Sequence, residues 1–298
     1  MKRLLLPLAL AVTAATAAAA DKKIVLLAGA ASHGTGAHEH LAGCLLLKQC
    51  LDTVPGVTCV VHSNGWPEDA GAAFKDAAAI AIYSDGEAGH PFLKGDRLAI
   101  IGALMQEGVG LAVIHYAVEP TQERGHKEFL DWMGGAFEQH WSVNPTWEAE
   151  FKDLPKHPIT RGVAPFKLRD EWYFHMRFRD GMKGVTPILS AIAPTNTMNR
   201  TDGAHSGNPA VREAVQRGEP QHLAWACERK DGGRGFGFTG GHFHTNWGDE
   251  NFRKVVLNAM LWVAKVEVPP GGVQSKITAE DLAQNHDAKD TGRRQRKK

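Results

Sequence analysis

An unbroken apolar run from Gly110 to Ile114, followed directly by His115, constrains the fold of this chain more than any other feature. Continuous aliphatic segments of this kind are typical of strands buried on both faces, which occur in the middle of parallel sheets. Ligands of open α/β sheets bind beyond the carboxyl ends of such strands. The run therefore predicts a parallel sheet with His115 at its functional edge.

The segments on either side of this run alternate between strand and helix patterns. Apolar strands are predicted at 22–29, 57–62 and 78–83, and helices at 37–51, 95–107, 123–133 and 249–263. This order predicts a doubly wound, mainly parallel α/β sheet with right-handed crossovers. The strands expected in the second half alternate or carry aromatic residues, so we expect them to be mixed or antiparallel additions. These are 146–152, 172–178, 185–192, 222–228 and 233–238.

The composition is that of a globular protein, with 43% hydrophobic and 22% charged residues among 298. A net charge of +1 gives no electrostatic reason to expect a nucleic-acid partner. Fifteen histidines and eight tryptophans are the unusual counts. Histidine serves in metal ligation and proton transfer, and tryptophan provides a flat surface for sugar rings. The alternative is a histidine-rich surface around a tryptophan-rich core.

The two ends of the chain differ from the rest in composition. Residues 1–20 combine a basic start, an apolar centre and a small-residue end before Asp21, which predicts a signal peptide and a periplasmic or secreted protein. The remaining sequence has no apolar run long enough for stable membrane insertion. We expect one α/β domain over 21–266 and a flexible basic tail over 267–298. Four cysteines could form disulfides in an oxidising compartment or remain buried thiols: Cys44, Cys50, Cys59 and Cys227.

The loop after the first strand concentrates polar chemistry in nine residues, Ser32 to His40. It contains His33, His38 and Glu39, with glycines that allow a tight turn and close approach to a ligand. The expected helix begins here, and its free N–H groups favour bound anions. The loop is either part of a catalytic site or a polar cap on the surface.

Two further strand ends carry candidate site residues. Asp85 follows the strand 78–83, where it could orient a histidine or stabilise its own turn. Late in the chain, His242 and His244 are two residues apart, so in an extended segment they would point to one side. That spacing is compatible with two ligands on one metal ion or one sugar. The possible ligands of a divalent metal are His38, His115, His242 and His244.

Aromatic and acidic residues add a candidate sugar-binding surface. Glu171 and Tyr173 would share one face of a strand, and Trp141 and Trp247 would provide flat rings, or else these residues pack in the core. No nucleophile elbow of the G-x-S-x-G type is present, and no cysteine follows a strand beside a histidine. The substrate-binding candidates are therefore Trp141, Glu171, Tyr173, His244 and Trp247.

Three motifs together resemble the ThuA-like (trehalose utilisation) family: the loop 32–40, the run 108–115 and the segment 235–242 with Trp247 after it. The resemblance spans about 22–263 and implies a flavodoxin-like sheet related to class I glutamine amidotransferases. In those relatives a cysteine follows the central strand. This chain has His115 there, so the thiolate chemistry of those relatives is not available to it.

The resemblance implies a role in carbohydrate metabolism, in the breakdown of oxidised (3-keto) glycosides by lyase or hydrolytic chemistry. A ketone at C3 acidifies the hydrogen on C2, so cleavage needs a general base, a stabiliser for the enolate and an acid for the leaving group. The expected partner is a small carbohydrate, and no cofactor is implied beyond a possible divalent metal. The alternatives are a non-catalytic sugar-binding protein and a histidine-dependent metallohydrolase of another substrate. The expected catalytic residues are His33, His38, Glu39, Asp85, His115 and His242.

Overall fold

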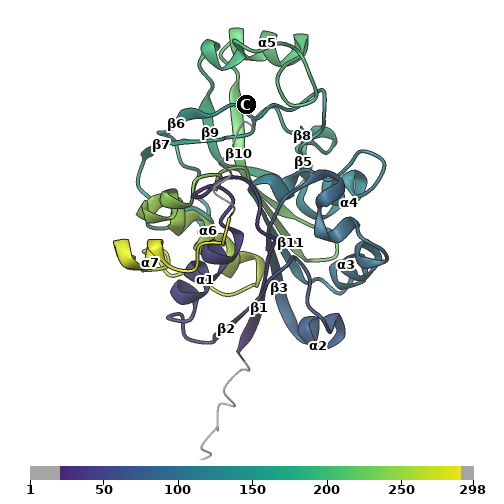
Figure 1. The fold of residues 1–298 in the computed structure, drawn as a ribbon, viewed down its shortest axis with the longest axis vertical. Coiled ribbons are helices and arrows are strands. Elements are labelled where there is room, and N and C mark those ends of the chain that lie inside the picture. Colours follow the sequence, from purple (N-terminus) through teal and green to yellow (C-terminus); the bar gives the residue numbers. More distant parts are fainter. Residues whose placement is uncertain (1–20, 290–298) are drawn as a thin grey trace, which may run out of the picture.

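A seven-stranded sheet forms the centre of the computed structural model, which describes residues 21–289 (Figure 1). Its strand order is β2-β1-β3-β4-β11-β10-β9. The first five strands pair in parallel, and β10 pairs antiparallel with both β11 and β9. The mainly parallel sheet with antiparallel additions predicted from the sequence is thereby confirmed. The strands are β1 (Lys22–Ala28), β2 (Val57–His62), β3 (Ala77–Tyr83), β4 (Gly110–Ile114), β9 (Val185–Ile192), β10 (Pro220–Glu228) and β11 (Arg234–Phe238).

Helices cover both faces of the sheet because its central strands are apolar on both faces (Figure 1). Alternate residues of β1 belong to different cores: Ile24 and Leu26 pack with α1 (His40–Leu51) and α6 (Glu250–Val263), whereas Val25 and Leu27 pack toward the opposite layer. That layer consists of α2 (Ala70–Phe74), α3 (Arg97–Gln106) and α4 (His126–Met133).

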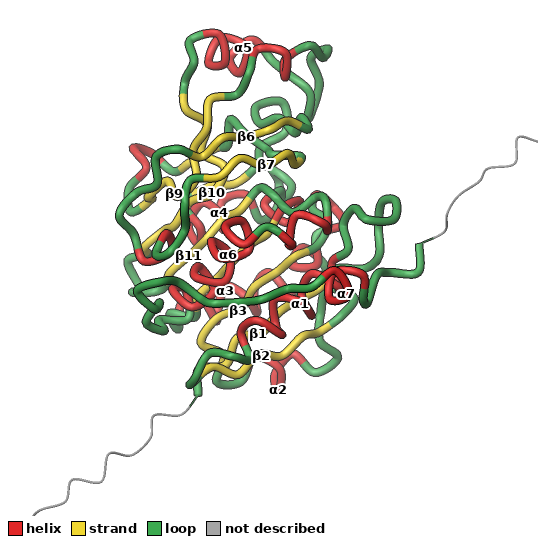
Figure 2. Tube along the Cα trace, turned by 90° about the vertical axis from the view of Figure 1, so that its left-hand side faces the viewer, coloured by secondary structure: helices red, strands yellow, loops and turns green. Residues whose placement is uncertain are grey.

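A smaller lobe extends beyond the antiparallel end of the sheet (Figure 2). It contains two two-stranded sheets and the helix α5 (Pro209–Gln216). The strands are β5 (Gly135–Ala136) with β8 (Arg177–Phe178), and β6 (Trp147–Phe151) with β7 (Phe166–Asp170).

This lobe differs from the sequence prediction in several elements, since neither β7 nor α5 is predicted. The strand expected over 172–178 is wrong for Trp172 to Met176, which are irregular. The segment pairs only through an isolated bridge between Phe174 and Val143, and a positive φ of 55° at His175 interrupts the extended backbone.

The strand β4 lies in direct backbone contact with α6, and Gly110 makes that contact possible. A β-carbon at Gly110 would lie 2.1 Å from the carbonyl oxygen of Val263. Only glycine lets the strand and the end of the helix approach this closely. The run that dominates the sequence is thus also in close contact with the end of α6.

The C-terminal segment runs back over the domain and ends near the loop after β1. Part of the tail expected to be flexible thus makes defined contacts: α7 is Ala279–Ala283, the Asp287 N–H donates to Glu39, and Lys289 pairs with the same carboxylate. Residues 290–298 and the predicted signal peptide, 1–20, lie outside the described residues. The four cysteines are buried free thiols. Between residues 21 and 289, no helix is long and apolar enough to cross a membrane.

Candidate functional site

Four neighbouring parallel strands each deliver a polar side chain to one edge of the sheet. His38 follows β1, Asp85 follows β3, His115 follows β4 and His242 follows β11. The carboxyl ends of parallel strands meet at one edge, which explains why residues spread over more than 200 positions lie together. The three histidines meet the carboxylate of Glu171, which follows β7. The four residues His38, His115, His242 and Glu171 are called the histidine cluster from here on.

His115 lies deepest in the cluster, at a sharp turn between β4 and a 3-10 turn over His115–Val118. Its φ is 57°, a left-handed conformation that non-glycine residues adopt rarely and at a cost in energy. The Nδ1–H donates to the carbonyl oxygen of Thr239 at 2.8 Å, which leaves Nε2 facing the cluster. This strand–turn–helix geometry is the kind that presents a catalytic nucleophile in other folds. Here it presents an imidazole with a fixed tautomer.

His38 is held by a carboxylate on one side and faces two imidazoles on the other. Its Nδ1–H donates to Asp85 Oδ1 at 2.8 Å, and the same oxygen accepts a 2.8 Å hydrogen bond from the Ser32 hydroxyl. Its Nε2 lies 3.1 Å from both His115 Nε2 and His242 Nδ1. Asp85 therefore orients His38, as the sequence suggested for an acid at that strand end.

The loops after β1 and β11, which the sequence presented as two separate motifs, form one structure. The His38 N–H donates to the carbonyl of His242 at 3.0 Å, and the His244 N–H donates to the carbonyl of Gly36 at 2.9 Å. This backbone pairing fixes the distance between His38 and His242.

Glu171 and Asp170, at the end of β7, complete the site from the side of the smaller lobe. Glu171 Oε2 lies 3.1 Å from His242 Nδ1 and 3.7 Å from His115 Nε2. Asp170 is fully buried, and its carboxylate accepts N–H hydrogen bonds from Gly241 at 2.7 Å, Glu171 at 2.8 Å and His242 at 3.1 Å. One carboxylate thus positions the backbone beneath two members of the cluster.

Burial dominates the electrostatics of the cluster. It lowers the pKa of His115 well below its usual value, and the neighbouring His38 adds to that effect. Burial raises the pKa of Tyr173, whose hydroxyl lies 3.4 Å from His115 Nε2 and therefore stays protonated. Burial also opposes ionisation of Asp85, but the hydrogen bonds from His38 and Ser32 outweigh it and the pKa of this carboxyl is lowered. The site therefore combines a neutral His115 imidazole with an ionised Asp85 carboxylate.

Two predicted catalytic residues, Glu39 and His33, lie beside the cluster and are not members of it. The Glu39 carboxylate is occupied by the N–H groups of Gly36 and Asp287 and by the ammonium of Lys289. His33 stands at the rim, with its ring 3.6 Å from that of His38 and its side chain 43% exposed.

Three other candidates lie farther from the centre. Trp141 stacks on His175 at 4.2 Å, with the Arg177 guanidinium over its ring. Trp247 is buried against Tyr83 and Phe252. The structure does not bring these rings, or His244, to the histidine cluster.

His244 departs from the prediction for a specific reason. The segment is not extended: His244 begins a 3-10 turn over His244–Gly248, so its ring turns away from that of His242 and lies 4.8 Å from His286. Its two ring nitrogens are buried and have no hydrogen-bond partner among the described residues. The expectation that His242 and His244 point to one side is therefore wrong.

Sequence reasoning missed a second polar group beside the cluster. His205 Nε2 lies 2.8 Å from Glu119 Oε1 and 2.9 Å from Glu87 Oε1, and Tyr116 donates to the same Glu87 oxygen. His205 belongs to a polar stretch that reads as a surface excursion, so its sequence carries no signal of this contact. Asp170 was also missed, because the strand that ends at it, β7, was not predicted.

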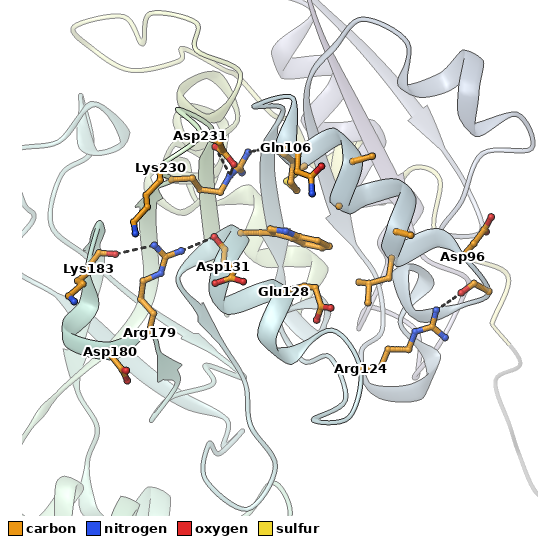
Figure 3. Close-up of a pocket in the computed structure, with 18 residues that line it drawn as sticks. Asp96, Gln106, Arg124, Glu128, Asp131, Arg179, Asp180, Lys183, Lys230 and Asp231 are labelled. Carbon is orange, nitrogen blue, oxygen red and sulfur yellow. Dashed lines mark hydrogen bonds and ion pairs between the residues drawn. The ribbon is translucent and has the colours of Figure 1, made fainter.

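A cavity of about 1160 Å³ lies elsewhere, between α3, α4 and the β10–β11 turn (Figure 3). Its arginines are used within the fold: Arg179 donates to the carbonyls of Leu130 and Asp131, and Arg229 to those of Met105 and Val109. Acidic and basic side chains alternate around it and do not converge on one point (Figure 3). We therefore place the functional site at the histidine cluster and not in this cavity.

Comparison with known proteins agrees with the motifs and the sheet. The model of the ThuA family, described as trehalose utilisation, matches residues 76–263. A ThuA-like protein from Bacteroides uniformis superposes with a TM-score of 0.57 at 16% identity, covering 84% of this chain and 94% of that one. A ThuA-like protein from Parabacteroides merdae gives 0.54 at 15% identity, covering 87% and 94%. At these identities the two structures support the fold alone. No curated protein sequence matches the chain.

Proposed function

The chain belongs to the ThuA (trehalose utilisation) family, and from that premise we propose that it is an exported enzyme that cleaves an oxidised, 3-keto glycoside. Family membership makes it a protein of carbohydrate utilisation. The proposed substrate and the proposed export, which rests on the signal-peptide pattern of residues 1–20, go further than that.

The observation that supports catalysis is the convergence of three imidazoles and one carboxylate at the edge of the sheet where α/β proteins bind ligands. In the proposed reaction a base removes the proton from C2, the electrons form a C1=C2 double bond, and the C1–O bond to the leaving group breaks. The leaving oxygen takes a proton and departs as an alcohol. For a hydrolytic outcome, water then adds across the double bond.

The accessible members of the cluster are the ones that could touch a sugar. The side chains of His242 and Glu171 are 16% and 19% exposed, while those of His38 and His115 are 1% and 0% exposed. We assign proton abstraction to the Glu171 carboxylate, which lies beside His242. We assign protonation of the leaving group to His33, which lies on the rim beside Asp85. Tyr173 keeps its proton and can hydrogen-bond to an oxygen of the ring.

A panel of native and 3-keto glycosides, read by mass spectrometry, tests the proposal. We expect release of the alcohol from a 3-keto glycoside only, loss of that release in His115→Ala, and normal release in His222→Ala. His222 is a matched control because it is a partly buried histidine that bonds to Ser190, away from the cluster. Undiminished release by a folded His115→Ala variant would refute the assignment of the site. Binding of glycosides without any product would identify a sugar-binding protein instead.

A further inference from the structure

We propose that the histidine cluster is a binding site for one divalent transition-metal ion. Its ligands are His38 Nε2, His115 Nε2, His242 Nδ1 and one oxygen of Glu171. These four side chains each offer a ligand atom, and the atoms all lie within 4.8 Å of one another. The site is defined by contacts among these four side chains and their neighbours, so it does not depend on the identity of the substrate.

The hydrogen-bond partners of His38 and His115 decide which of their ring nitrogens carry hydrogen. A carboxylate and a peptide carbonyl only accept hydrogen bonds, so Nδ1 is the protonated nitrogen of His38, which faces Asp85, and of His115, which faces Thr239. In the neutral rings of both residues, Nε2 then carries a lone pair and no hydrogen. These two lone pairs face each other at 3.1 Å, an arrangement that is repulsive unless a cation lies between them. His242 Nδ1 approaches the same point, 3.1 Å from His38 Nε2.

The groups that hold His38 and His115 from behind are those found behind metal-binding histidines. Metal-binding histidines characteristically donate their other N–H to a carboxylate or a backbone carbonyl, which fixes the ring and its tautomer. His38 and His115 show one of each, through Asp85 and Thr239. Both residues also have positive φ values, 50° and 57°, so the backbone is strained in order to aim them inward.

The distances between the ligand atoms and their chemical type indicate which ion the site would hold. Two ligand atoms 3.1 Å apart, each about 2.1 Å from an ion, subtend about 95° at it, close to the right angle of an octahedral site. Three nitrogen ligands and one oxygen favour zinc, iron, cobalt, nickel or manganese over magnesium or calcium. Because His38 and His115 are too deeply buried to touch a sugar, holding an ion also gives them a role that direct proton transfer does not.

A neighbouring group shows why geometry alone does not make a metal site. Glu87, Glu119 and His205 also bring three ligand atoms together. There, however, His205 Nε2 lies within hydrogen-bond distance of both carboxylates, and their hydrogen bond to it raises its pKa. A protonated imidazole neutralises that group without a metal. In the histidine cluster, by contrast, the Nδ1 atoms of His38 and His115 face Asp85 and Thr239, and their Nε2 atoms face each other.

The catalytic role of the ion rests on the proposed function. An ion in the cluster would have coordination positions open toward the accessible side of His242 and Glu171. Coordination of the C3 ketone oxygen would acidify the hydrogen on C2 and stabilise the enolate formed when that hydrogen is removed as a proton. The substrate class would then be sugars with a carbonyl adjacent to the carbon that loses its proton.

Titration of the full chain with Co²⁺ and with Zn²⁺ tests the site without any substrate. The protein is prepared without a histidine tag, treated with a chelator and dialysed, and binding is followed by the visible absorption of Co²⁺ and by elemental analysis. We expect one ion per chain. Glu171→Gln, His115→Ala and the outer variant Asp85→Asn should bind at least about tenfold more weakly. His205→Ala and His222→Ala, which alter histidines outside the cluster, should bind as the unmodified chain does.

Absence of stoichiometric binding, or equal loss in His205→Ala and Glu171→Gln, would overturn the inference. If His115→Ala does not fold, Glu171→Gln decides the outcome, because Glu171 is partly exposed and lies outside the hydrophobic cores. Metal binding without cleavage of 3-keto glycosides would refute the proposed substrate and leave the site intact. Equal cleavage by the metal-free protein would refute the metal's role in catalysis and leave the proposed function standing.

Discussion

Asp170 is the residue through which the fold is expected to control the site, and Asp170→Asn is the change that tests this. The buried carboxylate accepts three backbone N–H hydrogen bonds, from Gly241, His242 and Glu171. An asparagine keeps one oxygen, which can retain the two bonds now made to Oδ1. Its NH₂ group would then face the Gly241 N–H, which lies 2.7 Å from Oδ2, so one charge-assisted bond is lost and one buried donor has no acceptor.

The magnitude follows from this count. Loss of a hydrogen bond to a charged group and of a buried donor's partner costs about 2–4 kcal/mol. Burial raises the pKa of Asp170, which shows that its charge is itself costly, and the neutral asparagine recovers part of that cost. We therefore expect about 2 kcal/mol, which for a chain of this size corresponds to a fall in Tm of about 3–4 °C.

Differential scanning calorimetry measures this change, with Asp249→Asn as the matched control. Asp249 caps α6 by accepting the Phe252 N–H, and asparagine is an equally good cap, so its Tm should hardly change. Asp170→Asn should also weaken Co²⁺ binding, because the backbone of His242 and Glu171 loses its shared anchor. Equal Tm values for the two variants, with unchanged Co²⁺ affinity, would refute the reasoning.

Two further predictions address packing and pH. In a denaturant titration, Gly110→Ala should destabilise the domain by about 3 kcal/mol or prevent folding, because its β-carbon meets the Val263 carbonyl. Gly102→Ala is the control: its β-carbon meets only the Trp132 ring, at 3.5 Å, so the change should be neutral or stabilising. The pKa of His205 is raised, chiefly by the hydrogen bond to Glu119. The contribution of His205 to stability is therefore fully present below its unfolded pKa of about 6.5 and is lost as the pH rises through the raised pKa of the folded state. His205→Gln should accordingly lower Tm at pH 5–6 and have less effect at pH 9; a difference that does not vary with pH would contradict this.

Features of the sequence that depend on local physics were readable in advance. The aliphatic run before His115 required a strand buried on both faces, and the rule that ligands bind at strand ends then placed His38, Asp85, His115 and His242 at one edge. These predictions needed only the order of strands and the residues that follow each one. Glu171 was also identified, as part of a polar and aromatic strand end.

Features that depend on how the backbone turns after each strand were not readable. His38 and His175 have positive φ values, which sequence patterns do not predict for histidine. His244 begins a 3-10 turn, so the alternation that should have paired it with His242 does not apply. Glu39 faces the returning C-terminal segment, a contact between residues almost 250 positions apart that no local pattern records.

The most direct test of the account is cleavage of a 3-keto glycoside that carries deuterium on C2, with the released sugar trapped at once by borohydride reduction. If the histidine cluster acts as proposed, the alcohol is released and the deuterium is lost to solvent, and His115→Ala does neither. Release of the alcohol with the deuterium retained on C2 would mean direct displacement at C1 and would contradict proton abstraction by the cluster.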